Sequence, residues 1–260
     1  MTALVGLASV KGSPGVTSTS LALAAAWPRP VVLLEADPAG GDLTFRCRAA
    51  HGGVLYERRS ILSLAAESRA GSPSPTLVQD HAQRLSCGVD VVPGFTTASQ
   101  SHGLINLWSD LGAACQASSV DVIVDLGRLD GRSPLLPLAR SLDLLLMVTA
   151  ATLASAAHLT EALADVASAT AQRGGGPRVV PVLVGPDDSA ERDCADLDQL
   201  LRGSVVVPTT RALPVPYDVA ALARLERGDR PSGKLGRTLL LRRARQLSLA
   251  LDDIPGRVPA

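Results

Sequence analysis

The sequence predicts a single three-layer α/β domain, in which helices flank a mostly parallel central sheet. Short aliphatic runs alternate with helical patterns along the whole chain of 260 residues, which is typical of strands joined by crossover helices. Several runs are almost entirely apolar, as expected of strands that helices cover on both faces. The alternation continues across the Gly-, Pro- and Ser-rich stretches 71–75 and 174–177, which we therefore interpret as surface loops. We expect the domain to span residues 1–251 and residues 252–260 to form a flexible tail.

Strands are predicted from short runs that are rich in Val, Leu and Ile. In chain order the candidates are Ala3–Ser9, Val31–Glu35, Val89–Val92, Val120–Asp125, Leu142–Val148, Val179–Val184 and Val205–Val207. Parallel neighbours need right-handed connections that are long enough to hold a helix. The spacing between most of these runs allows such connections.

Helices are predicted where apolar residues recur at steps of three and four. In chain order these segments are Thr17–Ala26, Ile61–Ser68, Leu77–Leu85, Gly103–Ala117, Thr152–Gln172, Ala190–Leu201, Val219–Leu225 and Leu235–Leu251. They fall between the strand candidates, so the pattern favours one continuous α/β unit.

The composition narrows the class of protein. With 46% hydrophobic and 19% charged residues and a formal net charge of zero, the chain is typical of a well-cored soluble protein and not of a disordered one. Aromatic residues make up only 2%, which argues against a stacking surface for single-stranded nucleic acid. The four cysteines show no CxxC spacing, and no apolar run is long enough to span a bilayer. We therefore expect reduced core thiols and a cytoplasmic location.

The segment Leu4–Pro28 has most parts of a phosphate-binding loop. An apolar run over Leu4–Val10 predicts a strand, Lys11–Ser18 (KGSPGVTS) predicts a turn of small residues, and Ser18–Trp27 predicts a helix. This order points backbone N–H groups at an anion at the start of the helix. A standard loop has a lysine directly before its Ser or Thr, but that position here is Val16.

Acidic residues follow two further strands of the predicted sheet. Asp37 and Asp42 come after Val31–Glu35, and Asp125 ends the strand Val120–Asp125. Ligands bind beyond the carboxyl ends of the strands in open parallel sheets. Carboxylates beside an anion site suit Mg²⁺, and the hydroxyl of Thr17 would complete such a site. Each acidic residue taken alone is also a common turn or cap residue.

Together the three segments resemble the ParA/MinD superfamily of deviant-Walker P-loop ATPases. Lys11 corresponds to the signature lysine of that superfamily, Gly12 and Gly15 to loop glycines, and Thr17 to the hydroxyl that binds Mg²⁺. The segment LLEADPAGGDL resembles the second motif, and VIVDLG resembles the third. The VVPG, DLLLMVT and PVPYD segments also fall where such proteins have similar features, so the resemblance covers most of the chain.

The resemblance implies a P-loop NTPase-like fold with ATP and Mg²⁺ as cofactors. It assigns catalytic roles to Lys11 and Asp37, the latter orienting the attacking water, and metal binding to Thr17 and Asp125. The residues that it places around the nucleotide are Lys11, Gly12, Ser13, Gly15, Val16, Thr17 and Ser18.

Three departures from the family pattern bear on activity. Val16 stands in place of the loop lysine, Ser13 in place of a glycine, and Gly185 where many relatives have an asparagine that reads adenine. A hydrogen bond to a charged group is worth roughly 1.5–3 kcal/mol, so the missing lysine weakens expected triphosphate binding by about one to two decades. Turnover is expected to suffer more, because lysine also neutralises charge on the transferred phosphoryl group. Lys11 is a candidate for partial compensation.

The resemblance also implies partners. Members of the superfamily dimerise on ATP, so we expect a homodimer and a protein partner from a partition, division, secretion or pilus system. The arginine-rich segment Leu235–Leu251 has an apolar stripe formed by Leu240, Ala244, Leu247 and Leu251. We favour a helix packed on the sheet, while contact with DNA or a membrane, and hence a peripheral location at nucleoid or membrane, stays open.

Two functions of different class remain. One is a nucleotide-switched positioning protein with weak or slow ATPase activity, and the other is a pseudo-ATPase that serves as a dimerisation or docking module. Val16 favours the second, whereas Lys11, Thr17, Asp37 and Asp125 favour the first. The four scattered histidines and the absence of a G-x-S-x-G motif give little support to a zinc site or a serine nucleophile.

Overall fold

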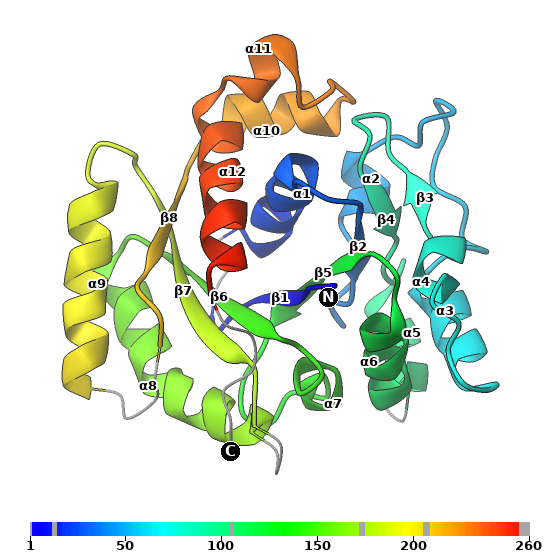
Figure 1. Cartoon of the computed structure of the whole chain (residues 1–260), viewed down its shortest axis with the longest axis horizontal. Helices are drawn as coiled ribbons and strands as arrows, with labels where there is room; N and C mark the ends of the chain where they lie inside the picture. The colour runs from blue at the N-terminus through cyan, green and yellow to red at the C-terminus, as the bar shows by residue number, and fades with distance from the viewer. Residues whose placement is uncertain (1, 12–14, 105–106, 172–174, 205–208, 255–260) are drawn as a thin grey trace.

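The computed structural model describes residues 2–11, 15–104, 107–171, 175–204 and 209–254. Within these ranges the strands form one eight-stranded sheet with the order β3-β4-β2-β5-β1-β6-β7-β8 (Figure 1). Its strands are β1 (Leu4–Ser9), β2 (Val31–Glu35), β3 (Gln83–Arg84), β4 (Asp90–Val92), β5 (Asp121–Arg128), β6 (Leu144–Ala150), β7 (Arg178–Gly185) and β8 (Leu213–Pro216). Every neighbouring pair is parallel except β3 with β4.

Helices cover both faces of this sheet. They are α1 (Val16–Ala26), α2 (Leu43–Arg46), α3 (Ile61–Ser68), α4 (Leu77–Asp80), α5 (Ala98–Ser101), the 3-10 turn η1 (His102–Leu104), α6 (Trp108–Ala117), α7 (Leu136–Ala139), α8 (Leu153–Thr170), α9 (Ala190–Ser204), α10 (Val219–Glu226), α11 (Gly233–Gly236) and α12 (Leu239–Asp252). One apolar cluster joins the sheet to α3, α4 and α6–α9, and a second joins its other face to α1, α2 and α10–α12. The structure thus confirms the predicted three-layer α/β class.

Strand β1 shows why the central strands of this fold can be predicted from apolar runs in the sequence. All its residues are buried between the two helical layers, and it pairs with β5 on one side and β6 on the other. A strand in this position has no solvent face that would select polar side chains. The strand candidates of the sequence therefore match most of the central strands.

Several boundaries differ from the prediction for local reasons. The helix predicted over Leu77–Leu85 ends at Asp80, because the chain turns into β3 and then reverses at Gly88, whose φ is 101°. Thr238 interrupts the segment Leu235–Leu251, which divides into α11 and α12.

The last strand also differs from the prediction. The candidate Val205–Val207 lies outside the described residues, and β8 is formed by Leu213–Pro216. Its two prolines lower strand propensity, yet they are tolerated because β8 lies at the edge of the sheet that the described residues form, next to β7.

The first residue of the predicted tail, Asp252, belongs to the last described helix. Asp252 is the last residue of α12, and both of its carboxylate oxygens accept from Arg29 at 2.9 Å. Residues 255–260 of that tail lie outside the described part. All four cysteines are buried as free thiols, as the sequence predicted.

Candidate functional site

The carboxyl ends of β1, β2 and β5 lie beside one another, because β1 and β2 both pair with β5 in parallel. Together with the first turn of α1 they border a cavity of about 490 Å³, which we call the α1 cavity. Its lining residues are Ser9, Gly15, Val16, Thr17, Ser18, Asp37, Ala39, Asp42, Arg46, Gly127 and Arg128. The fold therefore brings together the polar segments that follow β1, β2 and β5 in the sequence.

Gly15 sets the entry into α1. It is the N-cap residue with φ 92° and ψ 35°, a left-handed conformation that L side chains adopt only at a cost of about 1–2 kcal/mol. Its carbonyl accepts the amide of Thr19 at 2.8 Å. The glycine thus allows the loop to pass directly into the helix, whose N-terminal end borders the cavity.

Thr17 and Asp125 form the centre of the site. The Thr17 hydroxyl donates to the Asp125 carboxylate, whose Oδ1 also accepts the amide of Gly127 at 3.0 Å. Asp125 is 2% exposed. Burial raises the pKa of Asp125 to about 6, although the hydrogen bonds from Thr17 and Gly127 act in the opposite direction. A hydroxyl and a buried carboxylate in contact are suited to a small divalent cation.

Asp37 faces the same cavity from the loop after β2. Its Oδ1 accepts the amide of Ala39 at 2.8 Å. A Cβ at Gly127 would stand 2.0 Å from Asp37 Oδ2, so the glycine is what leaves room for this carboxylate. Burial raises the pKa of Asp37, and the nearby charge of Asp42 adds to this, while the Ala39 amide and Arg128 lower it.

Val16 is a mostly buried residue that also lines the cavity. Its side chain is 6% exposed and packs in the apolar cluster that holds α1 on the sheet, while part of it still lines the cavity. At the position of the family's loop lysine, the cavity is therefore lined by an apolar side chain.

Lys11 lies apart from the other predicted residues. It is exposed, and its Nζ is 3.3 Å from Nε2 of His158 on α8. The structure places Thr17, Ser18, Asp37 and Asp125 together but places Lys11 on the surface beside α8. Gly12 and Ser13 lie outside the described residues.

Glu35 is a buried carboxylate for which no role was predicted from sequence. It is 1% exposed at the end of β2, where Oε1 accepts the amide of Leu43 at 2.9 Å and Oε2 that of Gly94 at 3.1 Å. Burial raises the pKa of Glu35 to about 7, while the amides of Leu43 and Gly94 lower it. The side chain thereby fastens the segment after β2 to the loop after β4.

This arrangement predicts a pH-dependent stability. Between the unfolded value of 4.5 and the folded value of about 7, native Glu35 keeps a proton that the unfolded chain has released. The free energy of unfolding should therefore fall as the pH rises through this window, by up to about 1.4 kcal/mol per pH unit. Glu35→Gln should remove the Glu35 contribution, most clearly between pH 6 and 7, because Asp125, with a pKa of about 6, still contributes a slope of the same sign below pH 6.

Urea denaturation at pH 5, 6, 7 and 8 measures the effect. At pH 5 the variant should be less stable than the wild type, because glutamine keeps only one acceptor oxygen for the amides of Leu43 and Gly94. The difference in unfolding free energy between the variant and the wild type should shrink toward pH 8. Glu161→Gln, on the exposed face of α8, is the matched control and should keep the wild-type slope. A wild-type slope in Glu35→Gln would contradict the assignment.

Arg46 is a second residue that the sequence analysis missed. It lies on α2 and reaches the α1 cavity, where its Nη2 donates to Ser18 Oγ at 3.0 Å and its Nε to Glu226 Oε1 at 2.9 Å. Arg128 lines the same cavity at the end of β5. The site thus contains two guanidinium groups although Val16 carries no charge.

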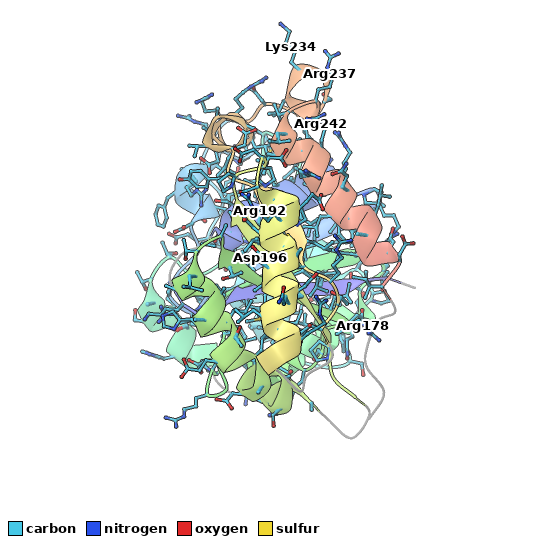
Figure 2. All side chains as sticks on the ribbon, turned by 90° about the vertical axis from the view of Figure 1, so that its left-hand side faces the viewer. Arg178, Arg192, Asp196, Lys234, Arg237 and Arg242 are labelled. Carbon is cyan, nitrogen blue, oxygen red and sulfur yellow. The ribbon has the colours of Figure 1, made fainter. Side chains whose placement is uncertain are left out.

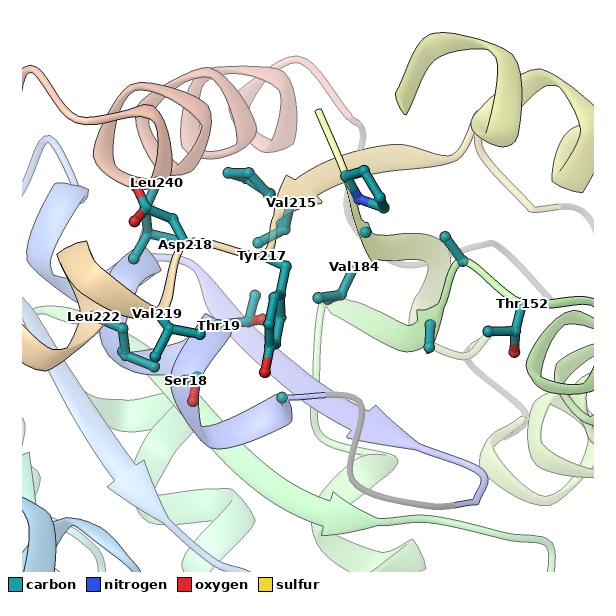
Figure 3. Close-up of a pocket in the computed structure, with 16 residues that line it drawn as sticks. Ser18, Thr19, Thr152, Val184, Val215, Tyr217, Asp218, Val219, Leu222 and Leu240 are labelled. Carbon is teal, nitrogen blue, oxygen red and sulfur yellow. The ribbon is translucent and has the colours of Figure 1, made fainter. Parts of the chain in front are cut away.

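A larger cavity of about 710 Å³ adjoins the first at α1 (Figure 3). Gly15 and Ser18 line both cavities, and the remaining walls come from the ends of β6, β7 and β8 and from α10 and α12. Figure 3 shows the Tyr217 ring standing over the first turn of α1. A Cβ at Gly185 would stand 2.6 Å from the Ala151 Cβ, so no asparagine fits there without movement of the chain.

The C-terminal helix has the packing that we favoured. Its apolar stripe, Leu240, Ala244, Leu247 and Leu251, is buried, and α12 packs on α1 and β8. Arg243 donates to Asp187, and Arg245 donates to the Gly236 carbonyl. Lys234, Arg237 and Arg242 instead project from one end of the molecule (Figure 2). Within the described part of the chain, none of the helices combines the length and apolar character that crossing a bilayer requires.

One histidine is less isolated than its place in the sequence suggests. His81 Nδ1 lies 2.8 Å from Ser63 Oγ, and its Nε2 lies 2.9 Å from Glu67 Oε2. Ser63 also exchanges hydrogen bonds with the backbone of Ser60 in the capping box of α3. Because that hydroxyl is already used to cap the helix, we assign it no role as a nucleophile.

No protein-family model and no curated protein sequence matches the chain. Solved structures do match it over nearly its full length. A ParA family ATPase from Chlorobium tepidum has a TM-score of 0.71 at 18% identity and covers 96% of this chain and 99% of its own. The septum site-determining protein MinD from Pyrococcus horikoshii, complexed with Mg-ADP, has a TM-score of 0.68 at 16% identity, with 97% of each chain covered.

An enzyme of metabolism also shares this fold. Cobyrinic acid a,c-diamide synthase from Mycobacterium smegmatis, with bound ADP and magnesium, has a TM-score of 0.61 at 16% identity and covers 96% of this chain and 94% of its own. Likeness at such identities defines the fold and leaves the function to the site. The chain therefore has the P-loop NTPase-like fold of the ParA and MinD ATPases.

Proposed function

We propose that this protein binds ATP·Mg²⁺ in the α1 cavity and acts as a nucleotide-switched positioning protein of the ParA/MinD type, with weak or slow hydrolysis. The observation that carries this proposal is the convergence of Thr17, Asp37 and Asp125 at the N-terminal end of α1. These residues come from three separate segments, and Thr17 and Asp125 in contact suit a magnesium ion beside the helix end that presents its N–H groups to phosphate.

The residues present fit a magnesium ion that arrives with its nucleotide. Among the described residues, no group of three or more His, Cys, Asp or Glu side chains is arranged to hold a metal by itself. Mg²⁺ in nucleotide sites is bound through one or two protein ligands together with phosphate oxygens and waters. Thr17 and Asp125 would supply the protein ligands, and the ion would shield the phosphate charge. Asp37 would orient the attacking water.

The neighbouring cavity suits the nucleoside. It shares Gly15 and Ser18 with the α1 cavity, and its walls are largely apolar, with Val184, Val215 and Leu222 among them. An adenine ring placed there would lie against side chains and the Tyr217 ring. Because Gly185 offers no side-chain amide, we expect weak discrimination between adenine and guanine.

Dimerisation and attachment are the remaining parts of the proposal. Lys11 is exposed and contacts His158 of α8 in its own chain, which supports the proposal that its ammonium acts in the site of a second copy. A protein of a partition, division, secretion or pilus system is the proposed partner. The exposed Lys234, Arg237 and Arg242 offer a contact for DNA phosphates, whereas the apolar stripe of α12 is buried and offers none for a membrane.

The second candidate is a pseudo-ATPase that keeps the fold as a dimerisation or docking module. The apolar, buried Val16 favours it, because the resemblance places the phosphate-binding lysine at that position. On this view the chain is a degenerate member of the superfamily.

Two measurements separate these candidates. Titration calorimetry with ATP and Mg²⁺ should give weak but saturable binding to the wild-type protein. Phosphate release should be slow and should disappear in Asp37→Ala, which leaves ATP binding intact. Binding with a release rate that does not depend on Asp37 identifies the pseudo-ATPase, and the lack of any ATP heat would remove nucleotide binding from both candidates.

A further inference from the structure

The α1 cavity contains a cation that comes from outside the phosphate-binding loop. Arg46 is the last residue of α2, the short helix that follows the acidic segment after β2. Its side chain is 28% exposed and lines the cavity together with Thr17 and Asp37. A guanidinium group suits phosphate oxygens because its N–H groups form a planar fork.

Ser18 is one of the groups that orient this guanidinium within the cavity. Nη2 of Arg46 donates to Ser18 Oγ at 3.0 Å, and Ser18 is in the first turn of α1. The arginine therefore lies against the end of the helix that presents its backbone N–H groups to an anion. Val16, which precedes Ser18 by two residues, leaves this region without the charge of a loop lysine.

Two carboxylates hold Arg46 in the structure. Both Nε and Nη2 donate to Glu226 Oε1, with Nε at 2.9 Å, and Nη1 lies 3.7 Å from Asp42 Oδ2. Glu226 is the last residue of α10, and its side chain is 20% exposed. The partner of the guanidinium is thus a largely buried anion on another helix, whereas Arg46 itself lines the cavity that a polyphosphate would enter.

We propose that Arg46 is a phosphate-binding residue of this protein, and that a polyphosphate replaces Glu226 as its partner. The inference rests on the proposed nucleotide site. It adds Arg46 as a binding residue and the replacement of Glu226 by phosphate. The phosphate takes the N–H groups that Glu226 accepts now, and Glu226 is released from α2. Since Arg46 joins α2 to Glu226 of α10, this exchange would couple polyphosphate binding to the contact between the two helices. Helix α10 also lines the neighbouring cavity through Val219 and Leu222.

The exchange predicts opposite effects for the two partners. Arg46→Gln should weaken the binding of ATP·Mg²⁺ and of inorganic tripolyphosphate by about tenfold, since it removes a charged hydrogen-bond donor. Glu226→Gln should tighten both by about threefold to tenfold, since it removes the competing charge. Arg48→Gln is the matched control, because Arg48 is exposed two residues further along the chain, and it should bind like the wild type.

Titration calorimetry on the full-length variants measures these affinities, and circular dichroism confirms that each is folded. In the double variant Arg46→Gln/Glu226→Gln, the gain from Glu226→Gln should disappear, because that gain acts through Arg46. Weaker binding by both single variants would assign the pair a structural role and overturn the inference. Equal binding by Arg46→Gln and wild type would overturn it and leave the proposed function standing, whereas absence of binding by the wild type would overturn both.

Discussion

Replacing Val16 by lysine is expected to tighten the binding of ATP·Mg²⁺ by about ten- to a hundredfold, the value of one strong charged hydrogen bond. Val16 is the first residue of α1, and its side chain lines the α1 cavity. The stem of a lysine can cover the apolar surface that valine covers now, while its ammonium reaches the cavity. Turnover should rise by a larger factor, because the lysine would also neutralise charge that develops during phosphoryl transfer. Titration calorimetry and phosphate release measure the two effects.

Val16→Met is the control for size, because methionine has a comparable length and no charge. It should leave the affinity near that of the wild type. Lysine should also restore binding in the Arg46→Gln background, because both side chains bring a positive charge to the same cavity. If Val16→Lys binds no more tightly than Val16→Met, the α1 cavity does not hold phosphate groups.

The parts of the site that lie next to a strand could be predicted from sequence. Asp125 follows a run of aliphatic residues on β5, and Thr17 lies two residues after the N-cap glycine of α1. Parallel strands meet with their carboxyl ends at one edge, so polar residues just after such runs must lie near one another. The same reasoning placed Asp37 in the site.

The residues that hold the site together could not be found in this way. Arg46 and Glu226 are separated by 180 positions and meet only because α2 and α10 pack over the same end of the sheet. Glu35 reads as the last residue of a strand, and its burial depends on the close approach of Gly41 and Gly94. A Cβ at Gly41 would stand 3.0 Å from the Gly94 Cα, so this contact exists only between glycines.

Prolines and short pairings account for the missed strands. β8 contains Pro214 and Pro216, which argue against a strand anywhere except at an edge. β3 is two residues long and depends on the turn at Gly88. Sequence patterns detect apolar periodicity over longer segments, and neither strand has enough residues to show it.

The largest loss of stability is expected from Asp121→Ala, at the opposite ends of the strands from the α1 cavity. Asp121 is 3% exposed at the start of β5, and it accepts three hydrogen bonds, each of 2.7 Å, from Ala3 N, Trp27 Nε1 and Arg29 Nε. Arg29 in turn binds Asp252 at the end of α12. Removing this carboxylate leaves the Trp27 donor buried without its partner and separates three segments. We expect the free energy of unfolding to fall by about 3–5 kcal/mol.

Thermal melting and urea denaturation measure this loss, which corresponds to a fall in Tm of about 10 °C. Asp143→Ala is the matched control, because Asp143 also accepts an amide of β1, that of Leu4 at 2.9 Å, and is less buried. It should cost about 1 kcal/mol. Where Asp121→Ala stays folded, its affinity for ATP·Mg²⁺ should equal that of the wild type, since Asp121 lies far from the cavity along β5. A loss no larger than that of Asp143→Ala would show that α1 and α12 are held to the sheet by their apolar contacts alone.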